Sequence, residues 1–279
     1  MPPSDDPVAA DTITKLPPEA SGRTVVSGSH GGVYPGWLAA AAGARAVVLC
    51  DAGGGKDGAG IAGLALCAGL GMAAAAVDST GCRIGDSADM LARGRISHAN
   101  AVARAVGVTP GQTCRAAVAA LAQAPAWRTK LPPRPGEGRG ELALPGAHRR
   151  VVLVDSAALV EAADAGAVIV TGSHGALVGG RPELALRTDG FAAVFNDAGG
   201  GPDGWGSSRL PALETRGIAA ATVAASSARI GEARSTYADG RLSAVNAPAA
   251  AAGLQIGHAC RDAVALLAAQ PPHGRGNGR

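Results

Sequence analysis

The sequence predicts an α/β protein built from two homologous Rossmann-like lobes, each a small parallel sheet with helices on both faces. Two motifs recur in the same order in the two halves of the chain. Gly-Ser-His-Gly occupies 28–31 and 172–175, and Asp-Ala-Gly-Gly-Gly-x-Asp-Gly occupies 51–58 and 197–204. Repetition at a nearly constant spacing indicates a duplicated structural unit. Short apolar runs also alternate with helix-like stretches, which is typical of a parallel sheet.

Shorter repeats extend the duplication along most of the 279 residues. Arg-Ile-Gly occurs at 83–85 and 229–231, and Gly-x-x-Cys-Arg occurs at 111–115 and 257–261. We therefore expect a first lobe at 8–124 and a second at 148–270. The segment 125–147 is rich in proline and glycine, which predicts an exposed linker. We expect the tail from Pro271 to be frayed.

The apolar runs place the strands of each lobe. In the first lobe we expect strands at 8–10, 24–26, 46–49 and 72–77. In the second they fall at 151–154, 167–170, 191–195 and 218–223. These runs carry almost no polar residues, as in strands that are covered on both faces.

Capping residues and glycines place the expected helices. One follows the strand at 151–154 and runs to Ala165, and another begins at Asp86 or Ser87 and stops at Gly94. Further helices are expected from Ser97 to Gly107 and from Thr109-Pro110 onward.

Composition excludes several classes of protein. A net charge of +3 with scattered basic residues does not resemble a nucleic-acid binder. The apolar runs are broken by Gly, Arg or Asp, so we expect no membrane span, and the acidic first residues are unlike a signal peptide. The five cysteines show no C-x-x-C pair, which suits reduced thiols and a cytoplasmic location.

The candidate catalytic residues follow the predicted strands. Ligands of open parallel sheets bind beyond the carboxyl ends of the strands. His30 and His174 stand at such ends, and an imidazole titrates near neutral pH, so each is a candidate acid or base. Asp51 and Asp197 follow the next strand and could orient the imidazole or a water. The alternative for each histidine is that it only hydrogen-bonds a neighbouring loop.

The candidate substrate-binding groups share the same strand-end loops. Glycines allow a ligand to approach the backbone closely, and arginine suits bidentate binding of a carboxylate or phosphate. Structural alternatives are a helix cap for the second aspartate of the glycine loop and local ion pairs for the arginines. The candidates are Ser29, Ser173, Gly31, Gly175, Lys56, Asp57, Asp203, Arg83 and Arg229.

These groups predict an enzyme that acts on a small anionic metabolite, bearing a carboxylate or a phosphate, in a cleft of glycine-rich loops. A hydrolase with histidine acid–base catalysis is the first candidate. An isomerase or lyase with proton transfer between two histidines is the second, and a non-catalytic metabolite-binding module is the third. One composite site and one site per lobe both remain open.

No cofactor is predicted, because the glycine spacing fits neither a P-loop nor a dinucleotide fingerprint. A divalent metal at His30, Asp51 and Asp57 ranks lower, since their spacing is not a recognised metal signature. Alanine-rich, lightly charged helices leave a homodimer open.

Overall fold

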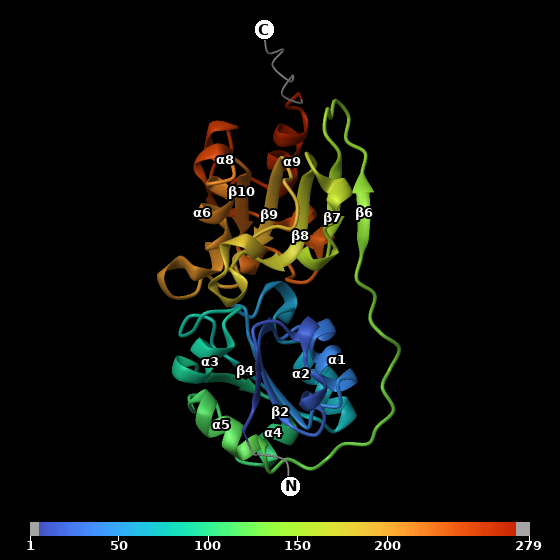
Figure 1. Cartoon of the computed structure of the whole chain (residues 1–279), viewed down its shortest axis with the longest axis vertical. Helices are drawn as coiled ribbons and strands as arrows, with labels where there is room; N and C mark the ends of the chain where they lie inside the picture. Colours follow the sequence, from blue (N-terminus) through green and yellow to red (C-terminus); the bar gives the residue numbers. More distant parts are fainter. Residues whose placement is uncertain (1–5, 272–279) are drawn as a thin grey trace.

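The protein is a mixed α/β structure with two sheets of mostly parallel strands flanked by helices. The computed structural model describes residues 6–271. Figure 1 shows the two sheets in two units stacked along the long axis, joined by a green segment along one side. The five-stranded sheet has the order β1-β2-β3-β4-β5, and the six-stranded sheet has the order β11-β10-β9-β8-β7-β6. We call these units the N-terminal half and the C-terminal half.

The N-terminal half is a three-layered unit. Its parallel strands are β1 (Val8–Ala10), β2 (Thr24–His30), β3 (Ala46–Cys50) and β4 (Ala73–Val77), and β5 (Ile96–Ala99) is an antiparallel edge. One face packs against α1 (Val33–Ala41) and α2 (Gly63–Leu70). The other packs against α3 (Ser87–Arg93), α4 (Ala101–Ala105) and α5 (Cys114–Leu121). Successive strand residues alternate between these two apolar cores, as the pleat requires.

The C-terminal half has a similar order with different edges. Its parallel strands are β7 (Val151–Val154), β8 (Val168–His174), β9 (Ala192–Asn196) and β10 (Ala219–Val223). The antiparallel edges are β6 (Arg139–Leu142) and β11 (Leu242–Val245). The helices are α6 (Arg209–Glu214) on one face, with α7 (Ala233–Asp239), α8 (Ala247–Ala251) and α9 (Cys260–Ala268) on the other.

Several elements differ from the sequence-based expectation. The segment before Ala165 forms short 3₁₀ turns at Ala157–Leu159 and Ala162–Asp164 rather than a longer helix. Ser97 lies in the edge strand β5, where its hydroxyl donates to the carbonyl of Ala76 on β4. Asn100 caps α4 instead.

The start of the last helix of the N-terminal half was also placed too early. Thr113, four positions after the predicted cap, accepts from the Ala116 amide at 3.3 Å and caps α5. The antiparallel edges β5 and β11 were not expected, because both are short and only partly apolar.

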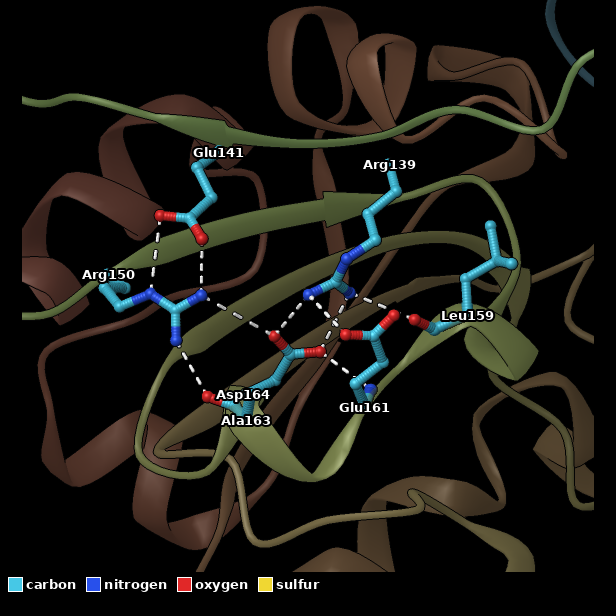
Figure 2. Close-up of polar contacts among 7 residues, drawn as sticks. All are labelled: Arg139, Glu141, Arg150, Leu159, Glu161, Ala163 and Asp164. Carbon is cyan, nitrogen blue, oxygen red and sulfur yellow. Dashed lines mark hydrogen bonds and ion pairs between the residues drawn. The ribbon is translucent and has the colours of Figure 1, made fainter.

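The segment between the halves is attached to both. Its strand β6 pairs with β7, and Figure 2 shows the ion pairs that fix it. Arg139 donates two hydrogen bonds to the fully buried carboxylate of Asp164, at 2.7 and 2.9 Å, and lowers the pKa of that carboxyl. Arg150 pairs with Glu141 beside them. At the N-terminal half, the indole of Trp127 donates to the carbonyl of Ala44 at 2.8 Å. The linker is therefore held at both ends.

Three smaller observations complete the fold. All five cysteines are unpaired and buried. Within residues 6–271, no helix has the length and apolar character needed to cross a bilayer. The expectation of a frayed tail concerns residues that lie, except for Pro271, outside the described part of the chain.

Candidate functional site

The two histidines stand at the ends of equivalent strands. His30 ends β2 opposite Cys50, and His174 ends β8 opposite Asn196, each after the same break in register with the neighbouring strand. The glycine two residues before each histidine is required by close backbone contact. A Cβ on Gly28 would lie 2.6 Å from the Asp11 carbonyl oxygen. The Gly-Ser-His loops therefore present both imidazoles at the carboxyl ends of their sheets.

Each imidazole lies against the Arg-Ile-Gly turn of the opposite half. A Cβ on Gly85 would lie 3.3 Å from Cε1 of His174, and one on Gly231 would lie 3.2 Å from Cε1 of His30. Both glycines have φ near the left-handed region, at +82° and +88°, which favours glycine. The two sheets thus meet through their carboxyl ends, in the zone between the units in Figure 1.

A cavity of about 430 Å³ lies between the halves and is lined by both histidines. Ser29 and Ser173, the residues that precede the histidines, also line it. Glu137 of the linker contributes to its wall. The structure therefore brings the two Gly-Ser-His motifs to one shared cavity.

His30 is held as a neutral imidazole with a defined proton position. Its Nδ1 accepts a hydrogen bond from the Gly32 amide at 3.2 Å, so the proton of the neutral ring is on Nε2. Burial lowers its pKa to about 4, because desolvation disfavours the charged ring. The half-buried side chain thus offers an N–H donor at neutral pH.

His174 differs in its surroundings. Its side chain is 9% exposed, and its buried Nδ1 has no hydrogen-bond partner in the part of the chain described. Burial, and then the charges of Arg209 and His30, lower its pKa to about 3. This imidazole is therefore neutral at pH 7.

Arg209 is a functional candidate that the sequence analysis missed. It begins α6, lines the cavity and is only 5% exposed. Its Nε donates to the carbonyl of Ala176 at 3.0 Å, and no carboxylate of residues 6–271 forms an ion pair with it. Burial lowers its pKa to about 10, so it stays charged at neutral pH. A buried cation without a counter-ion in a cavity favours an anionic ligand.

A signal for Arg209 was present in the repeat. The amides of Gly63 and Arg209 make the same contact, each donating at 2.8 Å to the carbonyl of the glycine that follows the histidine. Gly63 is therefore the counterpart of Arg209. The replacement of this glycine by a charged residue at an equivalent, buried position is the feature that could have identified Arg209.

Asp51 and Asp197 are not directed at the histidines. Oδ1 of Asp51 accepts from the amides of Gly53 and Ser79 at 3.0 and 2.9 Å. Oδ1 of Asp197 accepts from the amides of Gly199 and Ala225 at 3.0 and 2.8 Å. Both carboxylates hold their own glycine loops and lie outside the lining of the cavity.

The serine and glycine candidates are engaged with the backbone. Oγ of Ser29 accepts from the Ile13 amide at 3.0 Å, and Oγ of Ser173 accepts from the Ala157 amide at 2.9 Å. The amides of Gly31 and Gly175 each donate at 2.7 Å to a carbonyl of the neighbouring strand. These two amides are therefore not free to bind a ligand.

The charged candidates lie at the contact between the halves, outside the lining of the cavity. Arg229 pairs with Asp57 at 2.6 Å across the two halves. The guanidinium of Arg83 lies over the Trp205 ring, 4.5 Å from its centroid. The other two are Lys56, which pairs with Asp239 at 2.8 Å, and Asp203, which has a φ of +54° in the turn before α6.

The residues predicted as metal ligands do not form a metal site. In residues 6–271, no three or more His, Cys, Asp or Glu side chains are grouped closely enough to hold a metal ion, so His30, Asp51 and Asp57 are not brought together.

Comparison of the chain with protein-family models, curated proteins and solved structures finds no match. The functional argument therefore depends on the geometry of the cavity.

Proposed function

We propose that the protein is an enzyme that acts on a small anionic metabolite in the cavity between its halves. The observation that carries the proposal is the presence of His30, His174 and the unpaired Arg209 in one cavity. A guanidinium in a water-poor pocket binds a carboxylate or phosphate strongly. Two neutral imidazoles beside it supply the groups for proton transfer.

The two imidazoles have different roles in this proposal. His174 is assigned as the base because it lines the cavity as a neutral imidazole and its Nδ1 has no hydrogen-bond partner among residues 6–271. An anion bound to Arg209 offsets the positive charge that depresses the pKa of His174, and so strengthens this base. The Gly32 amide occupies Nδ1 of His30, so its Nε2 proton would be the one offered to the substrate oxygen on which negative charge develops. A neutral imidazole of lowered pKa can polarise a carbonyl in this way.

Hydrolysis is the first candidate reaction. His174 would take a proton from a water as that water attacks a carbonyl polarised by His30. It would then return the proton to the leaving oxygen or nitrogen as the bond between that atom and the carbonyl carbon breaks. Water rather than a side chain is the nucleophile in this scheme, because the hydroxyls of Ser29 and Ser173 accept backbone hydrogen bonds.

Proton transfer at carbon is the second candidate, favoured by the equivalent placement of the two imidazoles on the opposing halves. Incubation in deuterated water separates the two reactions. Only proton transfer at carbon introduces a carbon-bound deuterium into the product. Incubation in ¹⁸O-labelled water places the label in the product of hydrolysis.

The proposal is tested with a panel of small carboxylate- and phosphate-bearing esters, amides and hydroxy acids. For any compound turned over, His174→Ala and His30→Ala should each lower kcat by about 100-fold or more. His98→Ala is the matched control, since His98 is exposed on β5 away from the cavity. A double variant that retains full turnover would refute the acid–base proposal. Binding of anions without turnover of any compound would favour the binding module instead.

We further propose that the two halves are homologous Rossmann-like lobes that arose by duplication. The support is local and residue-specific: the repeated motifs make the same contacts in each half. The amide of Gly85 donates to Gly28 at 2.8 Å, and that of Gly231 donates to Gly172 at 2.7 Å. Removal of the linker provides a test. The segments 6–124 and 139–271, produced separately, should each show cooperative unfolding.

A further inference from the structure

We infer that Cys50 and Cys82 form a reversible disulfide in the folded protein, and that this bond moves the Arg-Ile-Gly turn that lies against His174. Both cysteines lie in the N-terminal half. Cys50 is the last residue of β3, and Cys82 lies in the loop that joins β4 to α3. Neither side chain takes part in the proposed reaction, so the disulfide stands or falls independently of that reaction.

The two thiols occupy one buried position at the end of the sheet. Both side chains are fully buried in the apolar core that packs against α3, α4 and α5. A side-chain hydrogen bond with Cys82, followed by burial, raises the pKa of the Cys50 thiol. The sulfur of Cys82 also donates to the Asp78 carbonyl at 3.3 Å. Two sulfurs in contact need only a small displacement to reach the bonded length of about 2 Å.

The C-terminal half supports this geometry. The residues at the same places in the repeated motifs are Asn196, for Cys50, and Ala228, for Cys82. The side-chain amide of Asn196 donates to the Ala228 carbonyl at 3.4 Å, and its oxygen accepts from the Ala198 amide at 2.9 Å. The side chain at this strand end therefore reaches the same later loop in both halves. Two thiols stand in the N-terminal half where the C-terminal half has a hydrogen bond.

The other three cysteines have no such arrangement. Within residues 6–271, none of them hydrogen-bonds another thiol. Cys67 lies in the core on the opposite face of the sheet. Cys114 shares the core of Cys82, but it begins α5 as Cys260 begins α9, so it belongs to a helix packing that both halves have. A disulfide is therefore expected between Cys50 and Cys82 alone.

Hydrogen peroxide, an oxidant little larger than water, supplies the oxidising equivalents for this step. The deprotonated sulfur of one cysteine attacks the peroxide, which gives a sulfenic acid and, after protonation, one water. The sulfur of the other cysteine then attacks the sulfenic sulfur, so that the S–S bond forms and the S–O bond breaks to release a second water. Two thiols and one peroxide thus give one disulfide and two waters. Dithiothreitol reverses the bond by exchange and becomes a disulfide itself.

Of the two cysteines, Cys82 is the less constrained. Cys50 belongs to β3, which is paired with β2 on one side and β4 on the other. Cys82 lies in an irregular loop, shortly before Gly85 of the Arg-Ile-Gly turn. Formation of the S–S bond therefore draws the start of this turn toward β3. Because Gly85 lies against Cε1 of His174 and its carbonyl accepts from the Gly179 amide at 2.7 Å, the displacement reaches the cavity wall of the C-terminal half.

Peroxide oxidation of the full chain with disulfide mapping is the first test. The incubation is at pH 8.5, because the raised pKa of Cys50 keeps the reactive thiolate scarce at neutral pH. Free thiols are then alkylated, and digestion before aspartate residues separates the Cys50, Cys67 and Cys82 peptides. We expect one peptide pair joined through Cys50 and Cys82, and its loss on treatment with dithiothreitol. A bond from Cys82 to Cys114, or no disulfide, would overturn the inference.

Variants and thermal unfolding check that the native fold makes the bond. Cys82→Ala, which introduces the residue found at this place in the C-terminal half, and Cys82→Ser should each abolish the disulfide. Cys67→Ala, in the opposite core, is the control and should form the bond as the wild type does. Because the disulfide closes a loop in the unfolded chain, oxidation should raise the thermal midpoint of the wild type by about 5 °C or more. An oxidised protein no more stable than the reduced one would contradict a bond made within the native geometry.

Histidine ring signals in ¹H–¹³C NMR spectra test the link to the cavity. The Cε1–H signal of His174, assigned with His174→Gln, should move by more than one linewidth on oxidation and return on reduction. It should stay fixed in Cys82→Ala treated in the same way. The signal of His258, which lies in the C-terminal half outside the lining of the cavity, should not move. A fully formed disulfide that leaves the His174 signal in place would remove the link between the thiol pair and the cavity.

Discussion

The two sides of the cavity are built from the same Gly-Ser-His-Gly motif, but the segment that follows this motif has a different structure in each half. In the N-terminal half, Gly-Ser-His-Gly leads directly into α1, which packs on α2 at Gly63. In the C-terminal half, the same motif leads into short 3₁₀ turns at Val178–Gly180 and Pro182–Leu184. The side chain of Arg209 donates to the carbonyl of Leu184 in the second turn and to those of Ala176 and Ala185, which flank the two turns.

This difference shows how a site can become asymmetric when the segment that follows one of two repeated motifs changes its structure. A helix that crosses the start of α2 leaves no room for a side chain there. Without that helix, the same position accepts a guanidinium. The two histidines are therefore equivalent in position but differ in their electrostatic partners, a helix start for His30 and a buried cation for His174.

The largest expected effect comes from adding one methyl group at Gly63. A Cβ at this position would lie 2.2 Å from the Gly32 carbonyl oxygen and 2.8 Å from that of Gly31, and all are backbone atoms. Gly63→Ala should therefore displace α1 and lower the free energy of unfolding by about 3 kcal/mol. The measurement is urea-induced unfolding followed by circular dichroism.

The matched control is Gly69→Ala in the same helix. A Cβ at Gly69 meets nothing within 4 Å, so this change should be neutral or stabilise by about 0.5 kcal/mol. Equal midpoints for the two variants would mean that the α1–α2 contact does not exclude a side chain. The contrast between Gly63 and Arg209 would then have no steric basis.

Most of the scaffold could be predicted from the sequence, since apolar runs located the parallel strands and the repeat located both histidines. Arg209 was missed, because Ser-Ser-Arg-Leu at 207–210 resembles the start of any surface helix and only the alignment of Arg209 with Gly63 in the repeat distinguishes it. Its burial follows from the missing helix after His174, where Gly179, Gly180 and Pro182 interrupt helical geometry. Asp51 and Asp197 misled for a similar reason. A carboxylate after a strand can cap its own loop as easily as it can face a ligand.

A smaller effect should distinguish the two histidines as the pH falls. Both have folded-state pKa values below the usual 6.5, about 4 for His30 and about 3 for His174. The unfolded chain therefore binds protons first, and stability that is fully present above pH 6.5 is lost below it. The loss is about 2 kcal/mol for His174 at pH 5 and is smaller for the half-buried His30. The loss of stability due to His174 should level off near pH 3, whereas the loss due to His30 should level off near pH 4.

Unfolding free energies between pH 3 and 7 provide the measurement. His174→Gln should flatten the profile more than His30→Gln, and His98→Gln should leave it unchanged. A bound carboxylate should also flatten it, because an anion at Arg209 favours a charged His174. If His174→Gln and His30→Gln both keep the pH dependence of the wild-type unfolding free energy, neither imidazole is held neutral by the fold.

The smallest effects are expected where the two halves touch outside the cavity. The indole of Trp205 donates to the Ile84 carbonyl at 2.9 Å and lies under Arg83, so Trp205→Phe should cost about 1 kcal/mol. Arg229 makes the equivalent crossing to Asp57, but both side chains are about half exposed. Arg229→Met should therefore leave the unfolding midpoint unchanged.

Thermal unfolding of these two variants tests whether the interface is as asymmetric as the cavity. A large loss in Arg229→Met with none in Trp205→Phe would reverse the assignment. If the expected order holds, the contact around Trp205 carries the interface, and it adjoins the second-half loop that leads to Arg209. The half that supplies the buried cation would then also supply the aromatic contact to the Arg-Ile-Gly turn that lies against His174.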